Sequence, residues 1–362
     1  DFGYPGMLPL LNREVLQYAI RACHVLNLHI TRDMHFDRKN YFYPDNPKNF
    51  QITQERTPIG RDGYIEIEID GIKKKIEILE MHIEEDTCKS VHSEKMSLLD
   101  FNRAGVPLIE IVTKPCIHSE EEAIKYLEKL RELLLYAFVS DCKIEEGSMR
   151  CEPNISISKT DKLGTKVEVK NIGSIANVGE AIKYEVKRQT EILEKGGVIR
   201  EETRRFDDKN HTTILMRVKE TGNDYRYFPE PDIPFVHLTD DFIEDSLKDL
   251  KRLPDERRET YKHRGILPIN IEKIIANKDI SDYLERFLDI DLVIASNLLL
   301  GDISAYLNKN NLRLKDTKLS DDKFKDLVNR LQNKKITNKI FKDILIDLME
   351  KDISIDEIIK EK

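Results

Sequence analysis

The 362-residue sequence contains no tryptophan, only five cysteines and no long hydrophobic run. The cysteines are scattered and lack CxxC spacing, which argues against a disulfide framework and a structural zinc site. No segment approaches the roughly 18 apolar residues of a membrane span, and no signal peptide is visible. Glycine motifs of the GxxxxGK[ST] and GxGxxG types are absent, and so is a GxSxG elbow. These absences argue against a secreted disulfide scaffold, a P-loop or Rossmann enzyme and a serine hydrolase.

The charge balance gives weak information about partners. The formal net charge is −8, and 40% of the residues are hydrophobic, which is enough for a sizeable core. An acidic chain is not a nucleic-acid binder by bulk electrostatics, because neutralising phosphates requires a surplus of Lys and Arg. A local basic strip or a partner subunit could still supply that surplus.

The first part of the sequence mixes helix and strand patterns. Two period-two segments, 64–69 and 73–79, flank Asp70-Gly71, and this pattern predicts a hairpin. A helix over 119–136 is predicted to begin with a capping box formed by Ser119 and Glu122. Further helices are predicted over 12–28 and 176–195, and further strands over 149–157, 164–171 and 213–220.

From Leu253-Pro254 onward the pattern is helical, with five short segments between residues 271 and 350. The expected fold class is therefore α+β. Residues 1–252 would form an antiparallel-sheet cradle with flanking helices, and residues 253–362 an all-α helical domain.

Several acidic residues are candidates for chemistry. They are Glu84 with Glu85, Glu110, Glu152 and Glu168. Carboxylates are the natural ligands of Mg²⁺, and strands of one sheet could each contribute one to a metal–nucleotide site. Glu110 is the most suggestive, because it interrupts an apolar run and a buried carboxylate needs a metal or a cation.

Plainer explanations exist for the same residues. The solvent face of a half-exposed antiparallel sheet alternates charged residues, which accounts for Glu66 and Glu68. Adjacent acids such as Glu84 and Glu85 are commonly solvated. His82 stands at alternate spacing from Glu84 and is either a ligand or an ordinary hydrogen-bonded histidine.

Two aromatic, proline-rich segments carry interleaved basic residues. Residues 36–54 contain Lys39 and Lys48, and residues 224–232 place Arg226 between two tyrosines. Such segments can stack on nucleic acid, line a polar passage or form rigid loops packed by their own aromatics. Arginines between 202 and 226 could hold carboxylate or phosphate groups.

These motifs resemble the GatB family, the B subunits of tRNA-dependent amidotransferases. The resemblance covers nearly the whole chain, with the motifs in the family's order. They are FDRKNYFYPDNPKNFQITQ, MHIEED, LDFNRAGVPLIEIV, EEGSMRC, ETRRFD, DYRYFPEPD, LPDERR and ASNLLLGDISAYLN.

The resemblance implies a glutamine-hydrolysing carbon–nitrogen ligase that works as part of a heterotrimer. The B subunit would use ATP and Mg²⁺ to phosphorylate the side-chain carboxylate of Glu-tRNA(Gln) or Asp-tRNA(Asn). Ammonia from the glutaminase A subunit would then displace the phosphate, with a small C subunit tying A and B together. A bacterial cytoplasmic location is expected, with an organellar one as the alternative, and no membrane association.

Site residues follow from the resemblance position by position. Glu85 and Glu110 match magnesium-binding, catalytic glutamates of the family. Glu168 and Glu84 fall on acidic positions of the same pocket, and Glu152 stands where the family has aspartate. Lys39 and Lys48 match basic residues of the ammonia channel and substrate pocket, to which Arg226 is added. EVKNIGSI departs from the family's EVKNLNSF at Gly173 and Ile175.

The ends also differ from the family pattern. The sequence begins after the family's IGLEVH-type strand, which carries further pocket residues, and it stops before the C-terminal tRNA-binding tail domain. The polypeptide alone is therefore expected to be inactive.

Two alternatives to a catalytic B subunit of this kind exist. The archaeal Glu-specific homologue needs a large insertion for which the segment between Asp232 and Leu253 has no room. The other is a non-catalytic tRNA-binding or assembly subunit.

Overall fold

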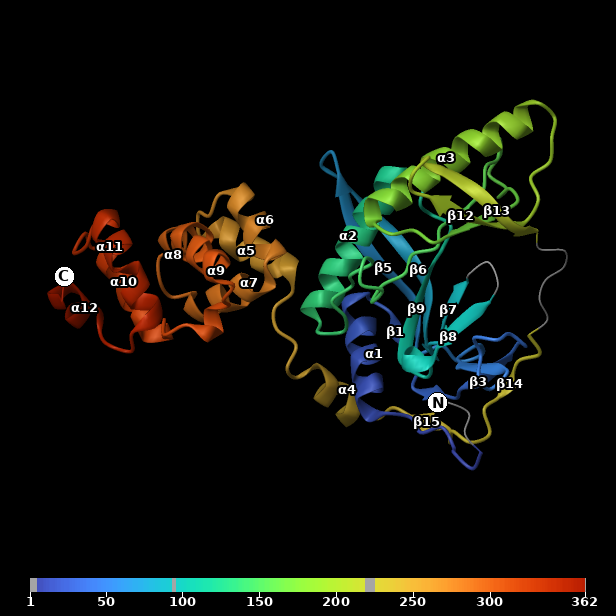
Figure 1. The fold of residues 1–362 in the computed structure, drawn as a ribbon, viewed down its shortest axis with the longest axis horizontal. Coiled ribbons are helices and arrows are strands. Elements are labelled where there is room, and N and C mark those ends of the chain that lie inside the picture. Colours follow the sequence, from blue (N-terminus) through green and yellow to red (C-terminus); the bar gives the residue numbers. More distant parts are fainter. Residues whose placement is uncertain (1–4, 93–95, 219–224, 362) are drawn as a thin grey trace. The chain divides into compact units, whose positions relative to one another are not determined.

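The computed structural model describes residues 5–92, 96–218 and 225–361, and the chain divides into two compact units, residues 1–251 and 252–362 (Figure 1). The first unit combines helices with mainly antiparallel sheets, and the second is helical. The predicted α+β class is therefore confirmed. Lys219, Glu220 and Asp224, at the ends of two predicted segments, lie outside the described residues.

The first unit contains both helices and strands. The helices are α1 (Arg13–Val25), η1 (Phe101–Arg103), α2 (Glu120–Tyr136), α3 (Ile175–Glu194) and α4 (Asp240–Leu247). The strands are β1 (His29–Ile30), β2 (Asp33–Met34), β3 (Asp37–Asn40), β4 (Phe50–Thr53), β5 (Gly60–Ile69), β6 (Ile72–Glu85), β7 (Lys89–His92), β8 (Ser97–Asp100), β9 (Pro107–Thr113), β10 (Asn154–Ile155), β11 (Val167–Lys170), β12 (Glu202–Asp207), β13 (Thr212–Val218), β14 (Phe228–Pro229) and β15 (Val236–His237).

The predicted hairpin forms the centre of the first sheet, whose order is β1-β5-β6-β9 with every pair antiparallel. Asp70 and Gly71 have φ values of 51° and 79°, as a two-residue turn that follows the strand twist requires. Ile65 and Ile76 face each other in the register and are buried. The strand β6 continues to Glu85, so Glu84 and Glu85 lie within the strand and not after it.

In both strands of this hairpin the alternation of buried and exposed residues is interrupted at the same position along the sheet. Asp62 and Leu79 lie between the register pairs Arg61↔Glu80 and Gly63↔Ile78, and Asp62 has a positive φ of 51°. The pairing of β6 with β9 shifts by one residue at the same level. In β6, the buried residues are therefore even-numbered up to Ile78 and odd-numbered from Met81. This bulge decides which face of the sheet each later residue of β6 occupies.

Helices pack on both four-stranded sheets of the unit. Helix α2 lies against β5 and beside α3, which contacts β10 and β13 (Figure 1). Ser119 caps α2 by accepting a 3.1 Å hydrogen bond from the backbone N–H of Glu122. The predicted capping box is incomplete, because the Glu122 carboxylate accepts from the N–H of His118, one residue before the cap. Lys74 also pairs with Glu122 and joins the helix to the hairpin.

The second sheet has the order β10-β11-β12-β13, and β11 pairs with β12 in parallel. Its strands are shorter than the segments predicted around 149–157 and 164–171. Val167 and Val169 are buried on one face, so Glu168 and Lys170 point to the opposite face.

The two aromatic segments pair with each other in a small sheet of order β14-β3-β4. Arg38 donates to both carboxylate oxygens of Glu230, at 2.7 and 2.9 Å, and its guanidinium lies 4.1 Å from the centre of the Phe50 ring. Glu230 is 3% exposed, so this bidentate pair is a buried link between segments 192 residues apart. The pairing of these two segments is therefore part of the fold of the first unit.

The second unit consists of short helices. They are α5 (Pro254–His263), α6 (Pro268–Ala276), α7 (Lys278–Leu284), η2 (Glu285–Phe287), α8 (Leu292–Leu298), η3 (Leu299–Ile303), α9 (Ser304–Asn310), η4 (Leu314–Asp316), α10 (Asp321–Gln332), α11 (Asn338–Glu350) and α12 (Ile355–Glu361). Tyr283, Phe287 and Phe324 pack as an aromatic cluster in its core. Within the described ranges, no helix is long and apolar enough to cross a membrane.

Candidate functional site

Three potential metal-binding side chains converge where β6 and β9 pair. His82 faces Glu110 across the ladder, and Glu84 follows His82 on the same face of β6. The His82 Nε2 atom lies 3.6 Å from Glu84 Oε2 and 3.5 Å from Glu110 Oε2. One ligand atom from each residue falls within 4.8 Å of the others, and no other such group of three occurs among the described residues. We call these residues the acidic cluster.

The two carboxylates of the acidic cluster stabilise a charged imidazole. Burial opposes the cationic form of His82, but the carboxylates of Glu110 and Glu84, which accept hydrogen bonds from the ring and carry negative charge, outweigh burial and raise the pKa of His82 to about 9. The hydrogen bond with His82 in turn lowers the pKa of Glu110. The cluster therefore places one imidazole between two carboxylates that favour its charged form.

Further charged and aromatic groups surround Glu110. The positive charges of Lys39 on β3 and Lys170 on β11 contribute to the lowered pKa of Glu110. The Lys39 ammonium lies 4.8 Å from the centre of the Tyr225 ring. The charges of Glu110 and Glu84 help to raise the pKa of Tyr227, although burial is the larger cause. Residues of the first sheet, the second sheet and the aromatic segments thus share one electrostatic environment.

The predicted residue Glu168 lies on β11 of the second sheet, and Glu152 lies close to it, just before β10. The Lys170 ammonium donates to Glu152 at 2.9 Å and lies 3.5 Å from Glu168. The Thr203 hydroxyl donates to Glu168 at 2.9 Å. Lys170 received no role from the sequence, although its alternate spacing from Glu168 was the signal that both side chains share a face.

Glu85 occupies a different environment from Glu84. Its Oε1 atom accepts hydrogen bonds from the Lys48 ammonium and, at 3.0 Å, from the N–H of Ile52 on β4. The Lys48 side chain is 7% exposed and that of Glu85 is 13% exposed. Two predicted residues thus form a buried ion pair beside the acidic cluster, and the roles assigned to them stay predictions.

The expected burial of the run around Glu110 is wrong, and the role of Arg226 is not tested. The run around Glu110 is not buried, because β9 is hydrogen-bonded only to β6 among the described strands and the Glu110 side chain is 52% exposed. Arg226 is exposed, and its carbonyl accepts a 2.8 Å hydrogen bond from Asn40. Its role as a pocket residue stays a prediction.

Arg204, one of the arginines between residues 202 and 226, does bind carboxylates, but these belong to the protein's own side chains. It pairs with Glu185 of α3 at 3.2 Å and with Glu202 at 3.1 Å, and Glu185 is fully buried. Arg188 pairs with Glu185 at 2.9 Å from within the helix. We call these four side chains the Glu185 network, which attaches α3 to the second sheet.

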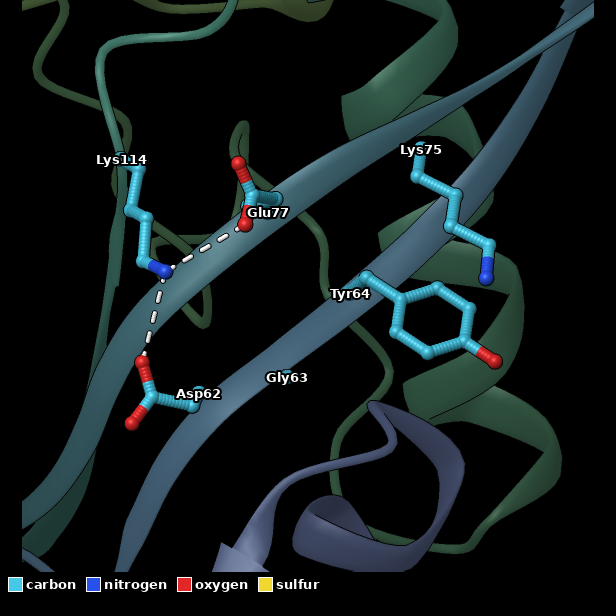
Figure 2. Close-up of a pocket in the computed structure, with 6 residues that line it drawn as sticks. All are labelled: Asp62, Gly63, Tyr64, Lys75, Glu77 and Lys114. Carbon is cyan, nitrogen blue, oxygen red and sulfur yellow. Dashed lines mark hydrogen bonds and ion pairs between the residues drawn. The ribbon is translucent and has the colours of Figure 1, made fainter.

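The hollow drawn in Figure 2, about 320 Å³ in volume, lies on the hairpin at the level of the bulge. There the Lys114 ammonium bridges Asp62 at 3.4 Å and Glu77 at 3.3 Å, while Lys75 lies over the Tyr64 ring (Figure 2). These exposed ion pairs connect β5 and β6 with Lys114, the residue after β9. The lining residues do not include any member of the acidic cluster.

The donor set of the acidic cluster fits a hard divalent cation in part. Glu84 and Glu110 offer carboxylate oxygens from adjacent strands, as Mg²⁺ prefers. His82 offers an imidazole nitrogen, which Mg²⁺ prefers less than oxygen, so it suits a role beside the carboxylates better than direct ligation of Mg²⁺. Glu85, Glu152 and Glu168 already have ammonium partners.

Comparison with known proteins gives a consistent result. The profile of the GatB/GatE catalytic domain matches residues 1–244, and that of the GatB domain matches residues 282–362. The chain is 46% identical over its whole length to the B subunit of the aspartyl/glutamyl-tRNA(Asn/Gln) amidotransferase of Lysinibacillus sphaericus, of which it covers 77%. It is 47% identical to the protein of the same name from Geobacillus thermodenitrificans and 45% identical to that from Staphylococcus saprophyticus, again over 100% of the chain and 77% of each relative.

Proposed function

The chain belongs to the GatB family of amidotransferase B subunits, and from this premise we propose that the acidic cluster is a kinase site for the amino acid carried by a misacylated tRNA. The observation that carries the proposal is the convergence of Glu84 and Glu110 from adjacent strands around His82. A tRNA-dependent amidotransferase must activate a carboxylate, and clustered carboxylates are suited to binding the metal that accompanies a nucleotide.

The proposed reaction has two steps. A side-chain carboxylate oxygen of Glu-tRNA(Gln) or Asp-tRNA(Asn) attacks the γ-phosphorus of ATP, and the bond to the departing ADP breaks. Ammonia then attacks the carbonyl carbon of the acyl phosphate and expels inorganic phosphate, which leaves an amide and releases a proton. The first step converts a poor leaving group into a good one.

In this proposal Glu84 and Glu110 hold Mg²⁺. The bound ion would neutralise charge on the phosphoryl group during its transfer. His82 keeps the two carboxylates close together, because its positive charge offsets their mutual repulsion. Lys39 and Lys170 supply further positive charge near Glu110. These cations would favour the approach of an anionic nucleotide to a site that is otherwise acidic.

The metal-binding roles of Glu85, Glu152 and Glu168 stay predictions, and we propose that these residues, with their lysine partners, also line the path of ammonia. The Lys48–Glu85 pair and the group of Lys170, Glu152 and Glu168 are polar but largely charge-compensated. Such a surface can hydrogen-bond to ammonia without a bare carboxylate that would hold it as ammonium. Arg226 is proposed to contact substrate from the exposed edge of the aromatic segment.

The partners follow from the names of the relatives and from the chemistry. We propose that a glutaminase A subunit supplies the ammonia, that a C subunit joins the complex, and that the misacylated tRNA is the substrate. The named relatives come from bacteria, which supports a bacterial cytoplasmic complex.

The test is an amidation assay of the reconstituted complex with Glu-tRNA(Gln) and with Asp-tRNA(Asn). Glu110→Gln is expected to abolish tRNA-dependent ATP hydrolysis and amidation while assembly stays intact. The control is Glu66→Gln, which removes an exposed carboxylate that pairs with Lys73 on the same hairpin. An assembled Glu110→Gln complex with normal amidation would instead show a non-catalytic subunit.

A further inference from the structure

We propose that Arg103 is a positioning residue that fixes the end of β6, which carries Glu84, against the segment that brings in Glu152. The proposal deepens the proposed function and rests on it. Arg103 is the last residue of η1, in the segment that leads to the start of β9 at Pro107 and to which the kinase site gives no role. The same holds for the segment 145–151, which the Arg103 side chain contacts.

The guanidinium of Arg103 makes two contacts in different directions. One terminal nitrogen, NH1, donates a 2.9 Å hydrogen bond to the carbonyl of Gly147. The other, NH2, lies 2.9 Å from the Asp86 carboxylate, whose side chain is 3% exposed. A planar guanidinium holds two such partners in a fixed relative geometry, which a single ammonium does not.

Each of these partners leads directly to acids of the site. Asp86 follows Glu84 and Glu85 at the end of β6, and its backbone bonds to Val106 and Gly105 beside the start of β9. The Gly147 segment runs on to Glu152, which joins Glu168 through Lys170. Arg103 is thus a bridge between the end of β6 and the segment that brings in Glu152.

The fit around this bridge is close. Gly147 has a φ of +76°, and a β-carbon at this position would lie 3.2 Å from the Arg103 terminal nitrogen. A larger residue would therefore be strained and would also push against the guanidinium. The glycine lets the backbone approach Arg103 closely enough to form the hydrogen bond.

Arg150 provides a matched comparison. It carries the same charge and reaches the same carboxylate, with 3.5 Å between its terminal nitrogen and Asp86 Oδ1, but its side chain is 64% exposed. If only positive charge near Asp86 mattered, loss of either arginine would have a similar effect. If the bridge sets the geometry, loss of Arg103 must be much more damaging.

The experiment compares Arg103→Ala, Arg103→Lys and Arg150→Ala in the reconstituted complex, with Glu110→Gln run in parallel. Four quantities are measured for each: kcat and KM for misacylated tRNA in amidation, Mn²⁺ affinity by electron paramagnetic resonance without tRNA, and the melting temperature. For Arg103→Ala we expect kcat and Mn²⁺ affinity to fall by about tenfold or more, as for other residues that orient metal ligands. KM should be retained. Arg103→Lys should be intermediate, and Arg150→Ala should stay within about threefold of the unsubstituted complex.

Equal effects of Arg103→Ala and Arg150→Ala would overturn the proposal, and so would full activity of Arg103→Lys. If Arg103→Ala does not assemble, the lysine variant decides: a defect larger than that of Arg150→Ala supports the bridge. A normal Arg103→Ala complex beside an inactive Glu110→Gln complex overturns the bridge alone. A fully active Glu110→Gln complex overturns the proposed function, and the bridge with it.

Discussion

Lys170 on the second sheet pairs with Glu152, 18 residues earlier in the chain, at a distance of 2.9 Å. The same ammonium lies 3.5 Å from Glu168, and its charge reaches Glu110 on the first sheet. One cation thus compensates acids contributed by separate segments.

Lys170→Met should weaken nucleotide binding more than it slows the chemical step. Without the ammonium, Glu152 and Glu168 add uncompensated negative charge to the site and repel the phosphates of ATP. We expect KM for ATP to rise roughly tenfold, with a smaller change in kcat. Lys166→Met is the control, because Lys166 lies on the same face of the chain just before β11 but pairs only loosely, at 4.0 Å, with Glu201. Equal KM values for both variants would contradict this prediction, which is checked by steady-state kinetics of the reconstituted complex.

Loss of Lys48 should destabilise the first unit. Lys48→Met leaves the Glu85 carboxylate with the Ile52 N–H but no cation in a site where both side chains are largely buried. We expect a loss of about 3 kcal/mol in the free energy of unfolding. Adding Glu85→Gln should recover part of it, because the unpaired charge is removed. Far-UV circular dichroism is the suitable probe, since the sequence lacks tryptophan. Strictly additive effects of the two substitutions would rule out the coupling.

The Glu185 network should make stability depend on acid pH. Burial opposes the charged form of Glu185, but hydrogen bonds from Arg188, Thr213 and Gln189 outweigh it and lower the pKa of the carboxyl group. A lowered folded-state pKa contributes stability that is complete above the ordinary glutamate value of about 4.3 and is lost as pH falls below it.

Glu185→Gln should therefore be less stable at neutral pH, by about 3 kcal/mol. The difference from the unsubstituted protein should shrink as pH falls below about 4.3. The measurement is urea unfolding across this range. A difference that stays constant with pH would show that the charge of Glu185 does not stabilise the fold.

Gly63 should tolerate no side chain. A β-carbon there would lie 2.5 Å from the carbonyl oxygen of Leu26 and 2.8 Å from the Leu28 side chain, and the backbone atom cannot rotate away. We expect Gly63→Ala to cost about 1–3 kcal/mol of unfolding free energy. Gly173→Ala is the matched control, since nothing lies within 4 Å of its added carbon. Similar melting temperatures for the two variants would refute the steric argument.

The local elements were the most predictable part of the fold. The alternation of apolar and charged residues on both sides of Asp70-Gly71 predicted the hairpin, and Ser119 predicted the start of α2. Both signals depend only on residues that are neighbours in the chain. Family motifs pointed first to Glu85 and Glu110 and then to Glu84. The structure brings Glu84 and Glu110 together, whereas Glu85 pairs with Lys48. The pattern of Glu168 and Lys170 on one strand also indicated a shared face.

Other features depend on contacts that no local pattern contains. Arg38 meets Glu230 across 192 residues, and Arg204 meets Glu185 of a helix, so neither partner could be read from its own segment. The exposure of Glu110 follows from the edge position of β9, which is a property of the sheet order. The incomplete capping box reflects competition from Lys74 and the His118 N–H for the Glu122 carboxylate.

The bulge at Asp62 and Leu79 restricts the insertions and deletions that β6 can accept during evolution. Because the two irregular residues face each other, deletion of Leu79 alone would put β6 out of step with β5. It would also turn His82 and Glu84 toward the face that now holds Met81 and Ile83. Leu79, an exposed residue without a chemical role, thus determines which face of the sheet carries His82 and Glu84. Insertions and deletions between this leucine and His82 should be far less tolerated than substitutions there.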